Sequence, residues 1–239
     1  MLPQLYNKAL KKIYKSYTPK QISQFWVPFI PFAFDEYNKS KIKIMIIGQE
    51  PVGWGQYKSL KKIKKELKDC QKEKLLYSEL IGFNKLFMNA ENNNLRESRN
   101  SRKAPFWSFA KKISIAFNET DDRRAVLWNN LFKLTDDSET DNELKLKALM
   151  DFNFLEGEID EFEPDICIFT IGEYDKHLPK ILDYTLYKNL SGSYKSNIIK
   201  LKNFKKVFAI VTNHPRYLQM NGYTDDFITK LKNSYKKFK

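Results

Sequence analysis

Residues with the chemistry of a binding site follow one apolar stretch near the start of the chain. Residues 43–47 read Lys43, Ile44, Met45, Ile46 and Ile47, and Gly48, Gln49, Glu50 and Pro51 come directly after them. A short apolar run bounded by turn residues is typical of a strand buried on both faces of a parallel sheet, and ligands of such sheets bind beyond the carboxyl ends of the strands. The sequence therefore predicts a carboxylate and an amide at a ligand site, with an ordinary strand-to-helix connection as the alternative.

Polar side chains also follow the other apolar runs. Asn129 and Asn130 end one run, Gly172 and Glu173 end the next, and Asn213 and His214 end the last. Because the carboxyl ends of parallel strands share one edge of a sheet, we expect an acid, several amides and an imidazole to converge there. The chain has two histidines. His214 stands in a His-Pro step at a strand end and is the functional candidate, whereas His177 falls in an expected helix.

Hydrophobic periodicity predicts the elements that position these residues. Helices are expected at 2–17, 57–81, 105–117, 142–155, near 175–187 and at 224–237, and an extended apolar segment at 25–34. Strands are expected within 42–55, at 125–132, 166–171 and 207–211, with a short strand on either side of a turn at 191–192. Strands that alternate with helices imply an α/β sandwich with a mostly parallel, four-stranded sheet flanked by helices. We expect one domain over 1–239, with a lysine-rich helical insertion at about 56–103.

The composition is that of a folded, strongly basic protein. Of the 239 residues 42% are hydrophobic and 15% aromatic, and the formal net charge is +13. So large a positive excess makes a polyanion the first partner to consider, with nucleic acid ahead of a membrane surface. The alternative explanation of the positive charge is a lysine-rich composition with no polyanionic partner. The polar loop expected at 89–103 ends in a basic cluster that includes Arg102 and Lys103.

The two cysteines, Cys70 and Cys167, have neither metal-ligand spacing nor the number needed for an iron–sulfur cluster. Cys167 lies in an apolar run and is expected in the core. We find no stretch of about 20 apolar residues and no signal peptide. We therefore expect a cytoplasmic protein with no membrane association, no metal and no cofactor.

Three motifs together resemble those of the uracil-DNA glycosylase superfamily. The family's Gly, Gln, Asp, Pro, Tyr, His motif appears as Gly48, Gln49, Glu50, Pro51, Val52 and Gly53, and its His, Pro, Ser, Pro, Leu motif appears as residues 214–218. The intervening strand that ends in Asn matches residues 126–129. The motifs come in the family's order and span residues 42–218. The resemblance implies a three-layer α/β fold and a monomeric, metal-independent DNA glycosylase that removes uracil or a C5-modified pyrimidine, in repair or in defence against modified foreign DNA.

The resemblance also implies a role for each matching residue. Glu50 would hold the attacking water and face the sugar cation, and neutral His214 would donate a hydrogen bond to the departing base. Gly48 and Gln49 would contribute backbone amides, and Asn129 would read the base edge. The base would be flipped out of the DNA, with Leu218 as the wedge and Arg216 on a phosphate.

Several positions depart from the family pattern. Glu50 replaces Asp, so its carboxylate reaches one methylene further. Val52 replaces a Tyr that blocks C5-substituted bases, which predicts a roomier pocket. The stacking Phe has no clear match, and Trp54, Phe106 and Trp107 are the candidates.

Two other functions fit parts of the sequence. The departures would suit a catalytically inactive, glycosylase-like module that binds DNA or a nucleotide. A doubly wound enzyme that binds a nucleotide phosphate at residues 48–55 fits less well, because the loop lacks the P-loop Lys-Ser/Thr pair and the Gly-x-Gly-x-x-Gly pattern.

Overall fold

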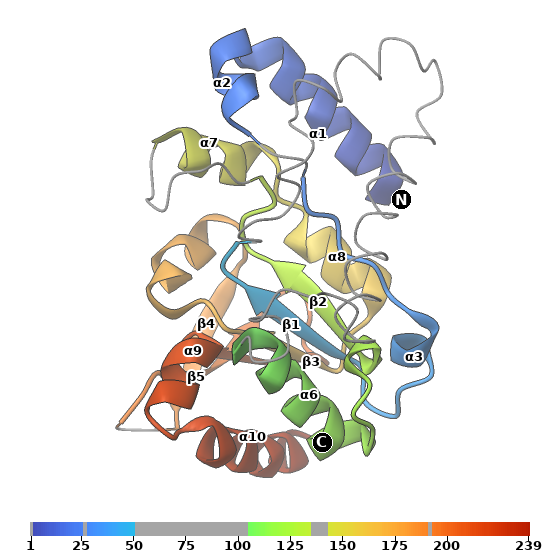
Figure 1. Cartoon of the computed structure of the whole chain (residues 1–239), viewed down its shortest axis with the longest axis vertical. Helices are drawn as coiled ribbons and strands as arrows, with labels where there is room; N and C mark the ends of the chain where they lie inside the picture. The colour runs from blue at the N-terminus through green and yellow to red at the C-terminus, as the bar shows by residue number, and fades with distance from the viewer. Residues whose placement is uncertain (1, 26–27, 51–104, 135–142, 191–192) are drawn as a thin grey trace, which may run out of the picture. The chain divides into compact units, whose positions relative to one another are not determined.

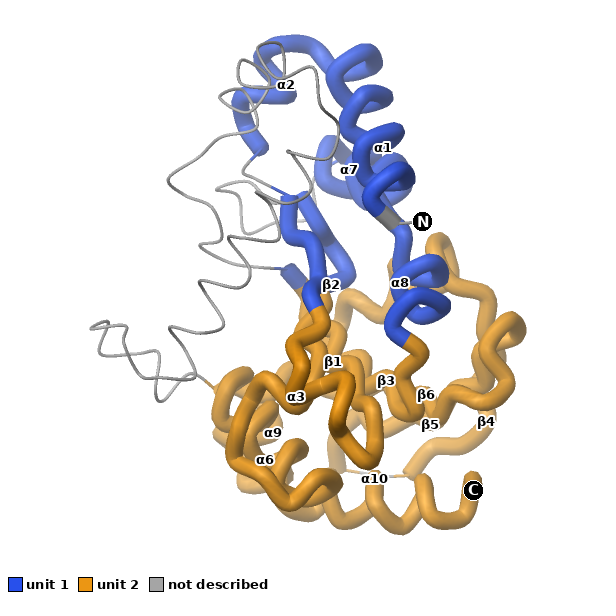
Figure 2. The backbone as a smooth tube through the Cα atoms, turned by 90° about the vertical axis from the view of Figure 1, so that its right-hand side faces the viewer, with its two compact units in different colours: residues 1–32, 50–86, 130–162 blue, residues 33–49, 87–129, 163–239 orange. Residues whose placement is uncertain are grey.

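A computed structural model describes residues 2–25, 28–50, 105–134, 143–190 and 193–239. Contacts divide the chain into two compact units (Figure 2). The described part of unit 1 is 2–25, 28–32, 50, 130–134 and 143–162, and that of unit 2 is 33–49, 105–129, 163–190 and 193–239. The helix expected at 57–81, the loop expected at 89–103 and most of the expected insertion lie outside the described residues. The single-domain expectation stays a prediction.

A mixed six-stranded sheet organises unit 2, with the strand order β2-β1-β3-β6-β5-β4 (Figures 1 and 2). The strands are β1 (Ile44–Gly48), β2 (Val126–Asn130), β3 (Ile166–Phe169), β4 (Tyr184–Asn189), β5 (Ser196–Leu201) and β6 (Phe208–Thr212). β1, β3 and β6 pair in parallel, with Ile46 opposite Ile168 and Ile168 opposite Ile210. β5 pairs antiparallel with both β6 and β4. Every residue of β1, β2, β3 and β6 is buried, as their continuous apolar sequences predict.

Helices α6 (Pro105–Asn118), α9 (Pro215–Met220) and α10 (Thr224–Phe238) pack together in unit 2. α6 begins at Pro105, which suits the first turn of a helix because proline has no N–H to leave unpaired. Its Phe109 meets Phe227 of α10 with ring centroids 5.8 Å apart. Phe208 of β6 meets Tyr235 of α10 at 5.9 Å. Aromatic contacts therefore fasten these helices to each other and to the sheet.

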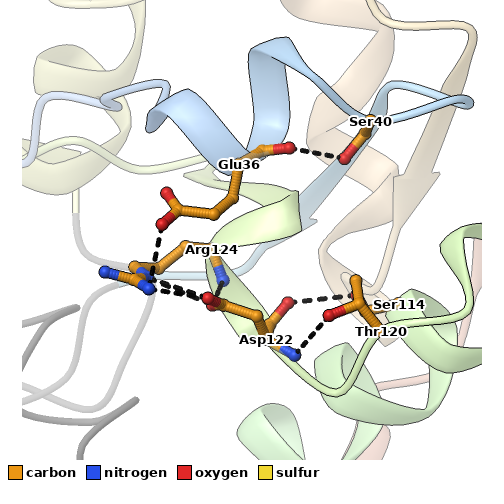
Figure 3. Close-up of polar contacts among 6 residues, drawn as sticks. All are labelled: Glu36, Ser40, Ser114, Thr120, Asp122 and Arg124. Carbon is orange, nitrogen blue, oxygen red and sulfur yellow. Dashed lines mark hydrogen bonds and ion pairs between the residues drawn. The ribbon is translucent and has the colours of Figure 1, made fainter.

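An ion-pair network fixes the turn that leads into β2 (Figure 3). Arg124 lies in a short 3-10 helix (Arg123–Ala125) and contacts Asp122 at 2.7 Å and Glu36 of helix α3 (Asp35–Asn38) at 2.9 Å. The Ser114 hydroxyl of α6 donates to the Asp122 carbonyl at 3.0 Å. These contacts join α3, α6 and the start of β2, and the bonds to Asp122 raise the pKa of Arg124 above its ordinary value.

Unit 1 consists of helices, which are α1 (Leu2–Ser16), α2 (Pro19–Gln24), α7 (Glu143–Asp151) and α8 (Leu155–Phe162) in its described part. The apolar face expected for the first helix is buried in one cluster with Phe25, Ile30 and Phe152. Thr18 and Gln21 form a reciprocal capping box that starts α2. Lys133 and Glu158 form an ion pair of 2.8 Å with both side chains 0% exposed, and the Tyr6 hydroxyl donates to the same carboxylate.

The structure corrects three expectations. The helix expected near 175–187 is a 3-10 helix (Gly172–Lys180) followed by β4, since Pro179 disrupts helical hydrogen bonding and the β-favouring residues 184–187 pair with β5. Among the described residues the sheet has six strands rather than four, because the two short strands expected around 191–192 are β4 and β5 and join it by antiparallel pairing. The helix expected at 142–155 ends at Asp151 as α7, and a helix that was not expected, α8, begins at Leu155, where Asn153 Oδ1 accepts a bond from the Leu155 N–H at 2.9 Å.

The buried ion pair of unit 1 makes a direct prediction about stability. Glu158→Ala leaves the buried Lys133 ammonium without its carboxylate, and removing one partner of a buried pair costs roughly 3–5 kcal/mol. Burial already lowers the pKa of Lys133, with Glu158 opposing the effect. Urea unfolding followed by circular dichroism measures the loss. A Glu158→Ala protein as stable as the wild type would contradict the importance of the pair.

Candidate active site

Three parallel strands of unit 2 deliver their following residues to one edge of the sheet. β1 leads into Gln49, β3 leads to Gly172, and β6 leads to His214. The Gln49 Nε2 donates to the Ile171 carbonyl at 3.0 Å. A Cβ added at Gly172 would lie 3.4 Å from Gln49 Nε2 and 3.7 Å from the His214 backbone nitrogen. The structure thus brings together Gln49 and His214, as the sequence predicts, with Gly172 between them.

Gly172 suits this place for two reasons. Its φ of +56° lies in the left-handed region, where a side chain is strained. The missing Cβ also leaves the space between Gln49 and His214 clear. Sequence reasoning marked the glycine only as the end of a strand.

His214 is the N-cap residue of α9, and this fixes the chemistry of its ring. Its Nδ1 accepts a hydrogen bond from the Arg216 backbone N–H at 3.2 Å. A neutral imidazole whose Nδ1 accepts carries its proton on Nε2. Burial lowers the pKa of His214 below its ordinary value of 6.5, and the Arg216 guanidinium lowers it further. The half-buried ring is therefore a neutral hydrogen-bond donor at pH 7.

Lys195 adds a positive charge at the same edge, which sequence reasoning missed. Its Nζ donates to the Gly172 carbonyl at 3.1 Å and to Asp175 at 2.8 Å. Its backbone N–H donates to Asn213 Oδ1 at 2.6 Å. The residue lies in the β4–β5 connection, which is distant in sequence from the motifs, so nothing in a single sequence marks it among many lysines.

Glu50 is described in unit 1, where its carboxylate contacts the Lys145 ammonium of α7 at 2.9 Å. The Lys145 side chain is 2% exposed and the Glu50 side chain 11%. A lysine buried this deeply needs an anionic partner. Lys145 is therefore a second residue that the sequence did not single out, and it holds the candidate carboxylate in one position.

The aromatic candidates on α6 form a cluster of three rings with Trp128. Ring centroids lie 5.0 Å apart for Phe106 and Trp107, 5.0 Å for Trp107 and Trp128, and 6.0 Å for Phe106 and Trp128. Trp107 is buried. Phe106 is half-buried.

The remaining candidates lie in different settings. Gly48 and Asn129 are buried, and the Asn129 amide donates to Met45 Sδ at 3.5 Å. Leu218 is 0% exposed, so the expected wedge role does not fit its position: a wedge must reach between bases. Arg216 is exposed, as a phosphate contact requires. Val52, Trp54, Arg102 and Lys103 lie outside the described residues.

The left-handed glycines offer a matched pair of variants. Gly172→Ala and Gly222→Ala both place a methyl group at positive φ, which costs about 1–2 kcal/mol each. A Cβ at Gly222 meets nothing within 4 Å, whereas one at Gly172 enters the space beside His214. We expect similar losses in thermal stability from both, with a shift of the His214 ring resonances in Gly172→Ala alone. Equal His214 spectra in the two variants would contradict the proposed geometry.

The environment of His214 predicts its titration. Because the folded state disfavours the charged ring, its NMR midpoint should fall below 6.5. The unfolded chain then binds the proton more readily, so the contribution of His214 to stability is present above about pH 6.5 and is lost as the pH falls below it. The variant His177→Gln assigns the two histidine signals. A His214 midpoint at or above 6.5 would contradict the prediction.

Within the described ranges, no three His, Cys, Asp or Glu side chains gather as ligands for a metal ion. None of the helices that the structure describes is both long and apolar enough to cross a membrane. No family model matches the chain, and no curated protein matches it in sequence.

Proposed function

We propose that the chain is a DNA glycosylase that hydrolyses the N-glycosidic bond of uracil or a C5-modified pyrimidine. The observation that supports this best is the meeting of Gln49 and His214 around Gly172, with the His214 Nδ1 occupied by a backbone N–H. A neutral imidazole with its proton on Nε2 is the donor that a departing pyrimidine anion requires. The mixed α/β fold is compatible with the resemblance of the three sequence motifs.

The proposed reaction separates charge, and His214 would act on its negative side. As the bond to the sugar breaks, electrons move onto the pyrimidine and negative charge builds on a carbonyl oxygen of the base. The Nε2–H would donate to that oxygen. A preorganised donor of this kind lowers the barrier by about 3–4 kcal/mol. The Lys195 ammonium lies at the same edge, where the Asp175 carboxylate at 2.8 Å balances its charge.

Glu50 would act on the positive side of the same reaction. The sugar becomes cation-like as the base leaves, and a carboxylate beside it both stabilises that charge and orients the attacking water. The Lys145 ammonium would position the carboxylate, with Oε2 engaged at 2.9 Å. The water oxygen forms the new bond to the sugar carbon, and the Glu50 carboxylate would accept the water's proton. The base leaves as an anion, which takes up a proton from solvent, and Glu50 returns its proton to solvent.

The positive charge of the chain and the exposed groups on α9 suit a DNA substrate. Arg216 is exposed and would contact a phosphate. Because Leu218 is buried, the exposed apolar side chains of α9 are Tyr217 at 43% and Met220 at 75%. These two could fill the space that a flipped base leaves.

A catalytically inactive module that binds DNA is the second candidate, and the Glu50–Lys145 ion pair favours it. A carboxylate already engaged by an ammonium interacts less strongly with a water or a sugar cation. In that case the site would retain recognition without turnover.

Base release from oligonucleotides tests the two candidates. Single strands and duplexes that contain uracil or a 5-substituted pyrimidine are incubated with the protein, abasic sites are detected by alkaline cleavage, and the freed base is identified by mass spectrometry. We expect Glu50→Gln and His214→Ala each to lower the single-turnover rate at least about a hundredfold, because each loses one preorganised interaction with the transition state.

Glu173→Gln is the matched control, since it makes the same chemical change at an exposed residue next to Gly172. It should retain the wild-type rate. Full activity in both Glu50→Gln and His214→Ala would refute the mechanism. Binding of DNA without release of any base would favour the inactive module.

A further inference from the structure

A groove in unit 2 lies away from the candidate active site. It has a volume of about 760 Å³ and is lined by β4, β5, the start of β6 and helix α10. Val207, Phe208 and Ala209 contribute from the start of β6, whereas His214 follows the end of that strand. The volume is that of sites that hold organic ligands. We call this site the basic groove.

The charges around the basic groove have one sign. Among the described residues that line it are six lysines and no Asp or Glu, the lysines being Lys188, Lys200, Lys202, Lys205, Lys230 and Lys237. Lys202 pairs with Asp183 and Lys230 with Asp226, both outside the lining. The other four form no ion pair with a described residue. Six cations around one cavity favour a ligand with several negative charges.

Helix α10 turns a polar face toward the groove. Lys230, Asn233, Ser234, Lys237 and Phe238 line the cavity, and their spacing of three and four residues places them on one side of the helix. The core face of the same helix carries Phe227, Leu231 and Tyr235, all buried. The side of α10 that faces the strands at the groove is therefore built for a solvated or charged occupant rather than for the core.

Aromatic rings stand among these lysines. Tyr187 is 60% exposed and Phe238 42% exposed, although both line the cavity. The Lys200 ammonium lies 3.9 Å from the centroid of the Tyr187 ring. Exposed rings beside cations form a surface on which flat aromatic groups can stack while nearby anions are neutralised.

We propose that the basic groove binds single-stranded DNA. Phosphates would contact the lysines, and unpaired bases would stack on Tyr187 and Phe238. A duplex hides its bases and would leave the rings unused. A ligand with a single carboxylate would pair with only one of the six lysines. A second copy of this chain also carries a net charge of +13, so electrostatic repulsion would oppose its binding to the groove. The choice of DNA over RNA rests on the proposed function, whereas the charge and ring argument stands without it.

Fluorescence anisotropy with a labelled oligothymidine of about ten nucleotides tests the proposal on the full chain. The double variant Lys200→Gln/Lys237→Gln should weaken binding about tenfold at low salt and flatten the dependence of log affinity on log salt by about one to two. Tyr187→Ala should weaken binding at least about fivefold without changing the salt dependence.

Lys206→Gln/Lys236→Gln is the matched control, because it removes the same charge from exposed lysines that do not line the groove. It should bind within about twofold of the wild type. An abasic oligonucleotide of equal length should bind more weakly than oligothymidine, since it has phosphates without bases. Equal effects of the two double variants would overturn the proposal. So would binding only to oligouridine, or only to vesicles of anionic phospholipid.

The outcome is separable from that of the proposed function. Groove binding without base release from any substrate would refute the glycosylase and leave the groove standing. Base release, together with an oligothymidine affinity that the groove variants do not change, would support the glycosylase and refute the binding of DNA in the basic groove.

Discussion

The candidate active site depends on a steric constraint at the end of three parallel strands. β1, β3 and β6 pair side by side, so the residues that follow them meet at one edge of the sheet. Residue 172 occupies the middle position in a left-handed conformation, and a side chain there would enter the space between Gln49 and His214. The left-handed backbone favours a glycine there, and an added Cβ would stand in van der Waals contact with both neighbours. The Lys195 ammonium also lies at this edge, where it donates a hydrogen bond to the Gly172 carbonyl. Gly172 therefore contributes both to the packing of the edge and to its electrostatics.

The hydrogen bond that begins α9 couples helix formation to the chemistry of the imidazole. An N-cap normally uses a short oxygen-bearing side chain, whereas here a ring nitrogen accepts the N–H of Arg216. Protonating Nδ1 would remove this acceptor and place a second cation beside the guanidinium. Burial and Arg216 both oppose that change and lower the pKa of His214. The helix end therefore keeps the ring neutral with Nε2–H as its donor, without a carboxylate partner being needed for the purpose.

The sequence predicts much of the fold because its strands are continuous apolar runs and its terminal helices have regular apolar faces. It predicts the convergence of Gln49 and His214, since that follows from parallel pairing alone. It predicts only a short strand before the turn at 191–192 and assigns most of β4 to a helix, because Tyr184–Asn189 is an exposed edge strand with no buried face to impose a pattern. It misses Lys145 and Lys195, since a lysine's burial and partner depend on contacts distant in sequence. Leu218 illustrates the opposite error: a motif position does not determine exposure.

Lysine serves two physical purposes in this chain, and burial separates them. Lys133 and Lys145 are buried against Glu158 and Glu50, so each contributes its charge to an internal pair. The lysines of the basic groove are mostly exposed, and no acid stands among the described residues that line it. A merely lysine-rich composition would intersperse acids there as it does elsewhere on α10, where Asp225 and Asp226 open the helix. Six lysines and no acid line a cavity that also exposes aromatic rings, which is a property of a binding surface rather than of average composition.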